Sequence, residues 1–245
     1  RKETYMEYDL TLFEKGLEEL GIALSQDQKK QFITYYEYLV EKNKVMNLTA
    51  ITEYEEVILK HFLDSLSIVK VSNFDQNKLA GKSVIDIGTG AGFPGIPLKI
   101  AFPELKITLL DSLNKRVNFL NEVIEMLGLK NVTAVHGRAE DYAKQKEHRE
   151  KYDFCVSRAV ANLSTLSEYC IPFVKEGGSF ISYKSEELTQ AENAVKILGG
   201  KVQDVVKFPL MDTDMDRSFV VIKKVKPTAK KYPRKAGLPS KEPLA

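Results

Sequence analysis

The sequence predicts an α/β fold with a mostly parallel sheet, preceded by a helical segment. From residue 84 onward, short apolar runs alternate with amphipathic stretches, which is typical of strands joined by helices. A glycine-rich turn directly follows the first apolar run, in the sequence VIDIGTGAGFPG from Val84 to Gly95. The first seventy or so residues show the helical spacing of apolar side chains.

Residues 1–71 are expected to form a helical subdomain with three helices. A weak first pattern contains Leu12, Leu17 and Leu20. The second helix follows a capping-box signal, Ser25 with Gln28, and its apolar positions are Phe32, Tyr35, Tyr36, Leu39 and Val40. For the third helix we expect a cap at Thr52 with Glu55, and an apolar face of Ile58, Phe62, Leu66 and Val69.

A sheet domain is predicted over residues 82–225, entered through a polar linker at 72–82. The expected strands are 84–87, 107–110, 132–135, 152–157, 178–183, 202–208 and 219–225, and the expected helices 95–102, 117–127, 163–174 and 187–198. The last two strands have no long helix between them. This predicts a Rossmann-like seven-stranded sheet with an antiparallel edge hairpin.

The glycine turn and Asp111 predict a pocket for a nucleoside ligand. Gly88, Gly90 and Gly92 remove side chains where the chain turns sharply against a ligand. Asp111 ends the next predicted strand, beside this turn, where its carboxylate can accept hydrogen bonds from both ribose hydroxyls. The alternative is an ordinary strand-to-helix turn, with Asp111 capping the following helix.

The spacing of the glycines favours one class of adenosine ligand. Phe93 occupies the third glycine position of a dinucleotide fingerprint, and no G-K-[ST] follows, as a P-loop would require. The remaining pattern is D-x-G-x-G-x-G from Asp86 to Gly92, the first motif of class I methyltransferases. S-adenosylmethionine is therefore the expected cofactor.

Composition limits which compartment, partners and metal sites can be expected for this protein. No apolar run is long enough to span a membrane and no secretory signal is present, so we expect a cytoplasmic protein without a membrane partner. Cys155 and Cys170 lie in apolar segments and are expected in the core. The three histidines are scattered, so no metal site is expected.

The positive charge is concentrated at the C-terminus. The chain has 36 basic and 34 acidic residues, yet eight basic residues and one acid fall between Lys223 and Ala245. We expect residues 226–245 to form a basic tail, which either contacts nucleic acid or only keeps the protein in solution.

Six blocks of sequence are similar to those of the bacterial 16S ribosomal RNA (guanine-N7) methyltransferases, formerly called glucose-inhibited division protein B. The resemblance spans nearly the whole chain. The blocks are NLTAI at 47–51, HFLDSL at 61–66, DIGTGAGFPGIPL at 86–98, GRAED at 137–141, SRAVANL at 157–163 and YPRKAG at 232–237. Leu238 departs from the small hydroxylated residue usual at that point of the family.

The resemblance implies a class I methyltransferase fold with an N-terminal helical cap. It also implies methylation of a guanine N7 in 16S ribosomal RNA, with that RNA or the small ribosomal subunit as partner of a monomeric enzyme. From the resemblance, the cofactor contacts are Gly88, Phe93, Ala139, Glu140 and Arg158. The glycine spacing and the strand pattern add Gly90 and Asp111. A class I methyltransferase of small molecules, or a nucleotide-binding module without chemistry, remains the alternative.

No catalytic acid or base is assigned, because guanine N7 carries a lone pair and no proton. Consistent with this, the chain has neither an [ND]-P-P-[YFW] motif nor a Pro-Cys pair. Expected RNA contacts are Lys184, Arg217, Lys230, Lys231 and Arg234. The Phe93 ring could stack on a base if the turn exposes it. His61 and Asp64 lie three residues apart on one helix face, which could place them near the mouth of the pocket. The alternative, which we favour, is a hydrogen-bonded packing pair.

Overall fold

The computed structural model describes residues 8–183, 188–211 and 213–245. Its sheet has seven strands in the order β3-β2-β1-β4-β5-β7-β6, which confirms the predicted fold class. Strands β1 to β5 are parallel, whereas β7 pairs antiparallel with both β5 and β6. The strands are β1 Ser83–Ile87, β2 Lys106–Asp111, β3 Val132–His136, β4 Tyr152–Ser157, β5 Val174–Ser182, β6 Gly200–Pro209 and β7 Asp216–Lys224.

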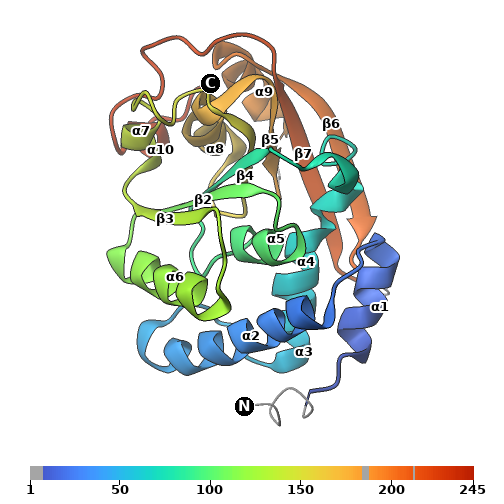
Figure 1. The fold of residues 1–245 in the computed structure, drawn as a ribbon. Helices are drawn as coiled ribbons and strands as arrows, with labels where there is room; N and C mark the ends of the chain where they lie inside the picture. The colour runs from blue at the N-terminus through green and yellow to red at the C-terminus, as the bar shows by residue number, and fades with distance from the viewer. Residues whose placement is uncertain (1–7, 184–187, 212) are drawn as a thin grey trace.

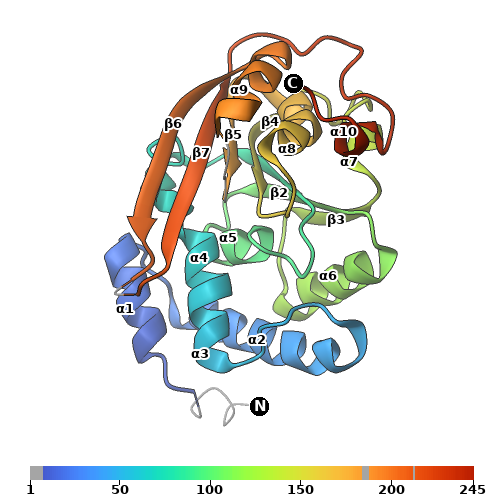
Figure 2. The same ribbon diagram turned by 180° about the vertical axis from the view of Figure 1, so that it is seen from behind.

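Helices cover both faces of the sheet (Figures 1 and 2). One face carries α5 Gly95–Ala101 and α6 Asn114–Leu127, and the other carries α7 Ala139–Tyr142, α8 Leu163–Cys170 and α9 Leu188–Ile197. The predicted helix at 163–174 is too long. A 3-10 turn at Ile171–Phe173 follows α8, and Val174 already pairs with Tyr152 in the sheet.

The N-terminal helices form a further layer outside α5 and α6 (Figure 1). They are α1 Thr11–Leu20, α2 Gln26–Met46, α3 Tyr54–Val57, a π-helical turn at Ile58–Leu63, α4 Asp64–Leu66 and a 3-10 turn at Ser67–Lys70. The capping box of Ser25 and Gln28 is confirmed. The predicted Thr52 cap is wrong, because Glu53 precedes α3 and makes no side-chain cap.

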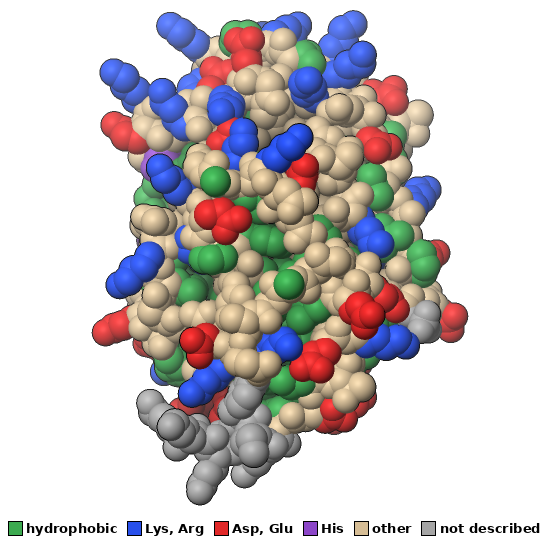
Figure 3. Space-filling model, turned by 45° about the vertical axis from the view of Figure 1, so that its right-hand side comes forward, with side chains coloured by type: hydrophobic (Ala, Val, Ile, Leu, Met, Phe, Trp, Pro, Cys, Tyr) green, Lys and Arg blue, Asp and Glu red, His purple; other side chains and the backbone are tan. Residues whose placement is uncertain are grey.

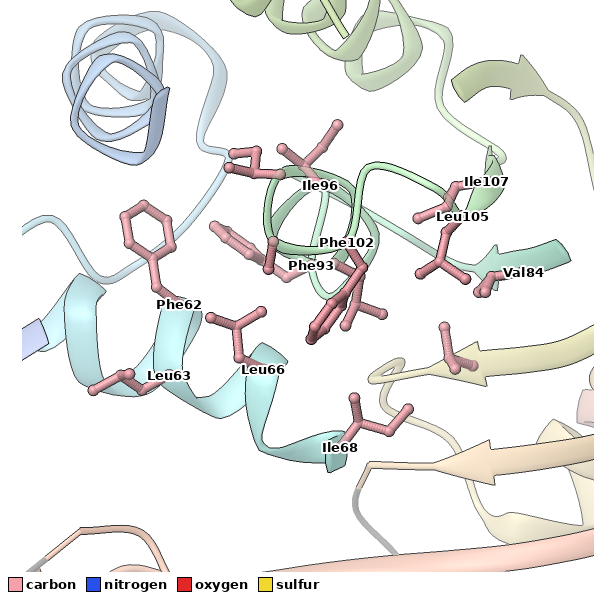
Figure 4. Close-up of a cluster of buried hydrophobic side chains, with 14 of the residues drawn as sticks. Phe62, Leu63, Leu66, Ile68, Val84, Phe93, Ile96, Phe102, Leu105 and Ile107 are labelled. Atoms are coloured by element: carbon pink, nitrogen blue, oxygen red, sulfur yellow. The ribbon is translucent and has the colours of Figure 1, made fainter. Parts of the chain in front are cut away.

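The N-terminal helices and the sheet share one apolar core. Figure 4 shows Phe62 and Leu66 close to Phe93 and Phe102, and all four belong to one buried cluster. Residues 72–82 are not a solvent-exposed linker, since Phe74 and Leu79 are buried there and a 3-10 turn spans Gln76–Lys78. The glycine turn therefore lies between the sheet and the N-terminal helices.

The chain after β7 crosses back over the end of the molecule and ends in α10, Leu238–Lys241 (Figure 2). Lys224, counted above with the basic residues of the C-terminus, ends β7 and is buried. Among the residues that the structure describes, no helix is both long and apolar enough to cross a membrane.

Candidate active site

The glycine turn is anchored to the end of the neighbouring strand. The amides of Gly88 and Thr89 both donate to the Leu110 carbonyl of β2, at 3.0 and 3.1 Å. Gly90 has a φ of +59°, and a Cβ built on it would meet no described atom within 4 Å. An L side chain is disfavoured at this φ, although space is available. Gly90 thus presents bare backbone to an open space.

Asp86, in the last part of β1, holds both ends of the glycine turn by hydrogen bonds. The side chain is fully buried, and its Oδ2 accepts hydrogen bonds from the Thr89 hydroxyl at 2.7 Å and the Gly95 amide at 2.9 Å. Burial raises the pKa of Asp86 to about 8. Asp86 therefore holds the start of α5 against the turn, and does not present a charge to a ligand.

Asp111 lies directly beside the turn, as its place at the end of β2 predicted. One carboxylate oxygen accepts from the Gly90 amide at 2.9 Å, and the other from the Leu113 amide at 2.9 Å. The Arg116 guanidinium lies 3.6 Å from Oδ2. The carboxylate and the bare backbone of Gly90 thus form one unit at the carboxyl edge of the sheet.

The N-terminal helices contribute a support that sequence reasoning missed. Tyr35 of α2 is buried, and its hydroxyl donates a hydrogen bond to the Ala91 carbonyl, between two glycines of the turn. Its ring stacks on Phe62 and packs against Phe93. In the sequence Tyr35 was one of several apolar positions on a helix face, and nothing local distinguished it.

Arg158 is the centre of a polar cluster at the end of β4. Its guanidinium donates to Asp64 at 2.8 Å, to His61 Nδ1 at 3.1 Å and to the Lys60 carbonyl at 3.3 Å. His61 and Asp64 share a helix face as expected, but each binds Arg158. The expected hydrogen bond between the two is absent among the described contacts.

His61 is held as a neutral imidazole. A guanidinium can only donate, so Nδ1 accepts from Arg158, and the proton resides on Nε2, which donates to Thr49 Oγ1 at 2.9 Å. Burial, together with the positive charge of Arg158, lowers the pKa of His61 to about 3. Thr49 belongs to the NLTAI block, which gave no sign of this contact.

Phe93 connects the glycine turn to this cluster. The ring is 6% exposed, so it is not open to a base as the stacking hypothesis requires. It stacks on His61, with centroids 4.3 Å apart and planes at 9°. The Arg158 guanidinium carbon lies 5.5 Å from the ring centroid, which brings two of the predicted cofactor contacts together.

Arg217 joins the same cluster from the start of β7. Its guanidinium forms an ion pair with Asp64, so Asp64 binds two arginines. With His61 neutral, the two arginines and Asp64 together carry one net positive charge. Arg217 is engaged within the protein, although a quarter of its side chain remains exposed. Lys184, predicted as an RNA contact at the end of the fifth strand, lies outside the described residues.

The GRAED block lies beside Asp111. The Gly137 amide donates to the Asp111 carbonyl at 3.0 Å, and α7 begins two residues later with Ala139 and Glu140. Both side chains are buried. The predicted contacts thus lie at one edge of the sheet: the glycine turn follows β1, Asp111 ends β2, and GRAED follows β3.

The basic residues predicted at the C-terminus differ in exposure. Lys230 and Lys231 are exposed. The segment after β7, to which they belong, crosses one end of the molecule in Figure 2, and lysine and arginine side chains gather at that end in Figure 3. Arg234 instead pairs with the buried Glu168, at 2.8 Å. Its guanidinium is committed to the protein's own carboxylate, which is a different role from the expected contact with RNA. Within the described residues, no group of three or more acidic, histidine or cysteine side chains could hold a metal ion.

The sheet order, the glycine turn and the acid at the end of β2 define the class I S-adenosylmethionine-dependent methyltransferases. The family model described as GidB, rRNA small subunit methyltransferase G, matches residues 28–216. The chain belongs to this family.

Several relatives carry the same description over nearly their full length. A ribosomal RNA small subunit methyltransferase G of Lachnoclostridium phytofermentans is 57% identical, covering 96% of this chain and 98% of the relative. Those of Clostridium botulinum strain Loch Maree and Desulforamulus reducens are 53% and 52% identical, covering 95% and 97% of this chain and 98% and 99% of theirs.

Solved structures resemble the fold at low sequence identity. One, of MtNAS in complex with MTA and tNA, has a TM-score of 0.55 at 14% identity, covering 80% of this chain and 71% of that one. A putative sarcosine dimethylglycine methyltransferase from Galdieria sulphuraria has a TM-score of 0.54 at 13% identity, covering 71% and 88%. These similarities support the fold assignment.

Proposed function

We propose that the chain transfers the methyl group of S-adenosylmethionine to N7 of a guanine in 16S ribosomal RNA of the small ribosomal subunit, in the cytoplasm and as a monomer. The observation that carries the cofactor assignment is the unit of Gly90 and Asp111. It combines backbone free of side chains with a carboxylate that can accept from ribose hydroxyls. The family supplies the RNA and the base.

The residues around this unit fit the rest of the cofactor. Gly88 and Phe93 of the turn would border the methionine portion, and Arg158 would lie at the reacting end. Ala139 and Glu140 would contact the adenosine portion, because they follow β3 next to Asp111. When bound, the cofactor supplies a methyl group activated by its positively charged sulfur.

The polar cluster explains how a site without a general base can promote this reaction. Guanine N7 is a nucleophile with no proton to remove, so the protein must orient it in line with the methyl group. Orientation alone supplies about 7–11 kcal/mol in favourable cases. Arg158 is fixed by three acceptors and Phe93 by a stacked His61, which makes the cluster rigid. His61 has a pKa of about 3 and adds no charge at neutral pH.

RNA recognition is assigned to the exposed basic residues and to the net charge of the cluster. Lys230 and Lys231 can neutralise phosphates, and each such contact contributes to the salt dependence of binding. Arg217 lies at the cluster with part of its guanidinium side chain exposed, which suits a phosphate near the target base. Binding to small-subunit RNA should weaken steeply as salt increases. A Lys230→Ala, Lys231→Ala double variant should show a shallower salt slope.

The reaction is tested by mass spectrometry of nucleosides. The purified chain is incubated with isotope-labelled S-adenosylmethionine and with either naked 16S RNA or small subunits from cells lacking the modification. Labelled 7-methylguanosine is the expected product. Labelled methyl on another position, or on small molecules alone, would overturn the assignment.

A matched pair of glycine variants tests the cofactor site. Gly90 and Gly128 have φ values of +59° and +64°, and a Cβ on either would meet no described atom within 4 Å. Both alanine substitutions therefore carry a similar backbone strain, of about 1–2 kcal/mol. Only Gly90→Ala should weaken calorimetric binding of S-adenosylhomocysteine, by about tenfold or more. Equal affinities for the two variants would reject the placement of the cofactor.

A further inference from the structure

The residues after β7, 225–245, pack onto the protein as a strap. Arg149 holds the first part: its guanidinium donates to the backbone carbonyls of Thr228, Ala229 and Tyr232, at 3.0, 3.1 and 2.8 Å. The Thr228 hydroxyl also donates to the Leu198 carbonyl at 2.6 Å. The strap is therefore bound through specific contacts, and is not a free basic tail.

A buried ion pair holds the middle of the strap. Glu168 of α8 is fully buried and accepts from Arg234 Nε at 3.0 Å and Nη2 at 2.8 Å. The backbone amide of Arg234 adds a third hydrogen bond, at 2.8 Å. Paired charge-assisted hydrogen bonds of this kind fix both position and orientation. Among the described residues, Arg234 is the one basic partner of this buried carboxylate, which makes it the principal anchor of the strap.

Three residues beyond this anchor, the strap reaches the proposed cofactor site. The Gly237 amide donates to Glu140 Oε2 at 2.8 Å, and Glu140 is 4% exposed. Among the described residues, the one side-chain hydrogen bond found for the Glu140 carboxylate is this bond to Oε2. Ala139 lies in the same apolar cluster as Tyr232 and Leu244. The strap thus binds Glu140 directly and packs against the apolar cluster to which Ala139 belongs.

We infer that the strap is a positioning element for the methyl donor, with Arg234 as its key residue. This inference rests on the proposed function. Arg234 locks the strap to Glu168, and the Gly237 amide then orients the Glu140 carboxylate so that Oε1 faces a donor group of adenosine. Gly237 and Glu140 are far apart in sequence, and only a docked strap brings them together. Docking of the strap and binding of the cofactor should therefore favour each other.

Hydrogen exchange on the unmodified full chain tests the coupling directly. If the strap favours the cofactor, the cofactor must favour the docked strap to the same extent. S-adenosylhomocysteine at saturation should slow amide exchange in peptides covering residues 228–241, in addition to slowing exchange at the glycine turn. Unchanged exchange in these peptides, with exchange at the turn slowed, would overturn the inference.

Variants at the anchor provide an independent measurement. Arg234→Ala should weaken binding of S-adenosylhomocysteine about tenfold or more, and Arg234→Lys less, because lysine keeps the charge but not the paired geometry. Lys241→Ala is the matched control, since it removes an exposed basic side chain of the same strap. In assays at saturating RNA, Arg234→Lys should raise KM for the methyl donor much more than it lowers kcat. Unchanged affinity in Arg234→Ala would contradict the proposal.

Different results would overturn the proposed function and the role of the strap. If the unmodified chain does not bind S-adenosylhomocysteine, the proposed function fails. If the unmodified chain binds and Gly90→Ala weakens binding, while Arg234→Ala has no effect and exchange in the strap does not change, only the role of the strap is overturned. If Arg234→Ala does not fold, the exchange experiment on the unmodified chain decides.

Discussion

Replacing Tyr35 with phenylalanine tests whether the N-terminal helices hold the glycine turn in place. Tyr35 is 1% exposed, and its hydroxyl is the donor to the Ala91 carbonyl. Phenylalanine keeps the ring and its packing against Phe62 and Phe93, but removes the donor. No other described hydrogen bond reaches the Ala91 carbonyl. The substitution therefore leaves a buried acceptor without a partner.

The expected loss of stability is about 1–3 kcal/mol, the usual cost of an unsatisfied buried polar group. For a chain of this length, each kcal/mol corresponds to a decrease in Tm of about 2–4 °C. Because Ala91 lies in the turn that borders the cofactor, affinity for S-adenosylhomocysteine should also decrease, by about three- to tenfold. Urea unfolding and calorimetry measure the two effects.

Tyr38→Phe is the matched control on the same helix. Tyr38 stacks on Phe119, with centroids 5.6 Å apart, and its hydroxyl makes no hydrogen bond within the described part of the chain. This variant removes the same atom and should change neither quantity beyond about 0.5 kcal/mol. If Tyr35→Phe is as stable as Tyr38→Phe and binds the cofactor product equally well, the N-terminal helices do not support the turn.

Three further predictions concern stability. The unfolded chain protonates His61 near its ordinary pKa of 6.5, whereas the folded chain does so only at about 3, so the free energy of unfolding should decrease by about 2 kcal/mol between pH 7 and pH 5. Urea titrations should show this slope reduced in His61→Gln but not in His136→Gln, which removes an exposed histidine. Gly95→Ala should cost about 1–3 kcal/mol, because its Cβ would lie 2.1 Å from Leu109 Cδ2; a variant as stable as the unmodified chain in thermal unfolding would contradict this. Lys224→Met should cost about 2–4 kcal/mol, since it removes the buried partner of two carbonyls and of Glu150; unchanged urea midpoints would reject this role.

Local sequence patterns predicted most of the fold. Apolar periodicity placed the seven strands, and the absence of a helix between the last two predicted the antiparallel hairpin. The errors occurred where a local signal competed with tertiary packing. Thr52 has the residue type of a cap, yet α3 begins after Glu53. The polar residues of 72–82 suggested a linker, but Phe74 and Leu79 pack into the core.

The candidate site was predicted less completely. Because Asp111 ends a strand beside the glycine turn, its position followed from the geometry of parallel sheets. The contacts of Arg158 could not be derived in this way, since its partner Asp64 is 94 residues away. Arg234 looked like any other basic residue of the C-terminus, and its partner Glu168 is 66 residues away.

The sequence by itself determined the class of fold, the glycine turn with its neighbouring acid, and the family resemblance, because each of these is encoded by residues close together in the chain. Only the tertiary structure decided that Tyr35 supports the turn, that one carboxylate binds two arginines, and that the C-terminal residues form a docked strap. The physical reason is that a buried polar group pairs with whichever partner lies close to it in the folded chain, however far away in sequence. The residue type of a charged or polar side chain does not tell whether it faces water or a buried partner.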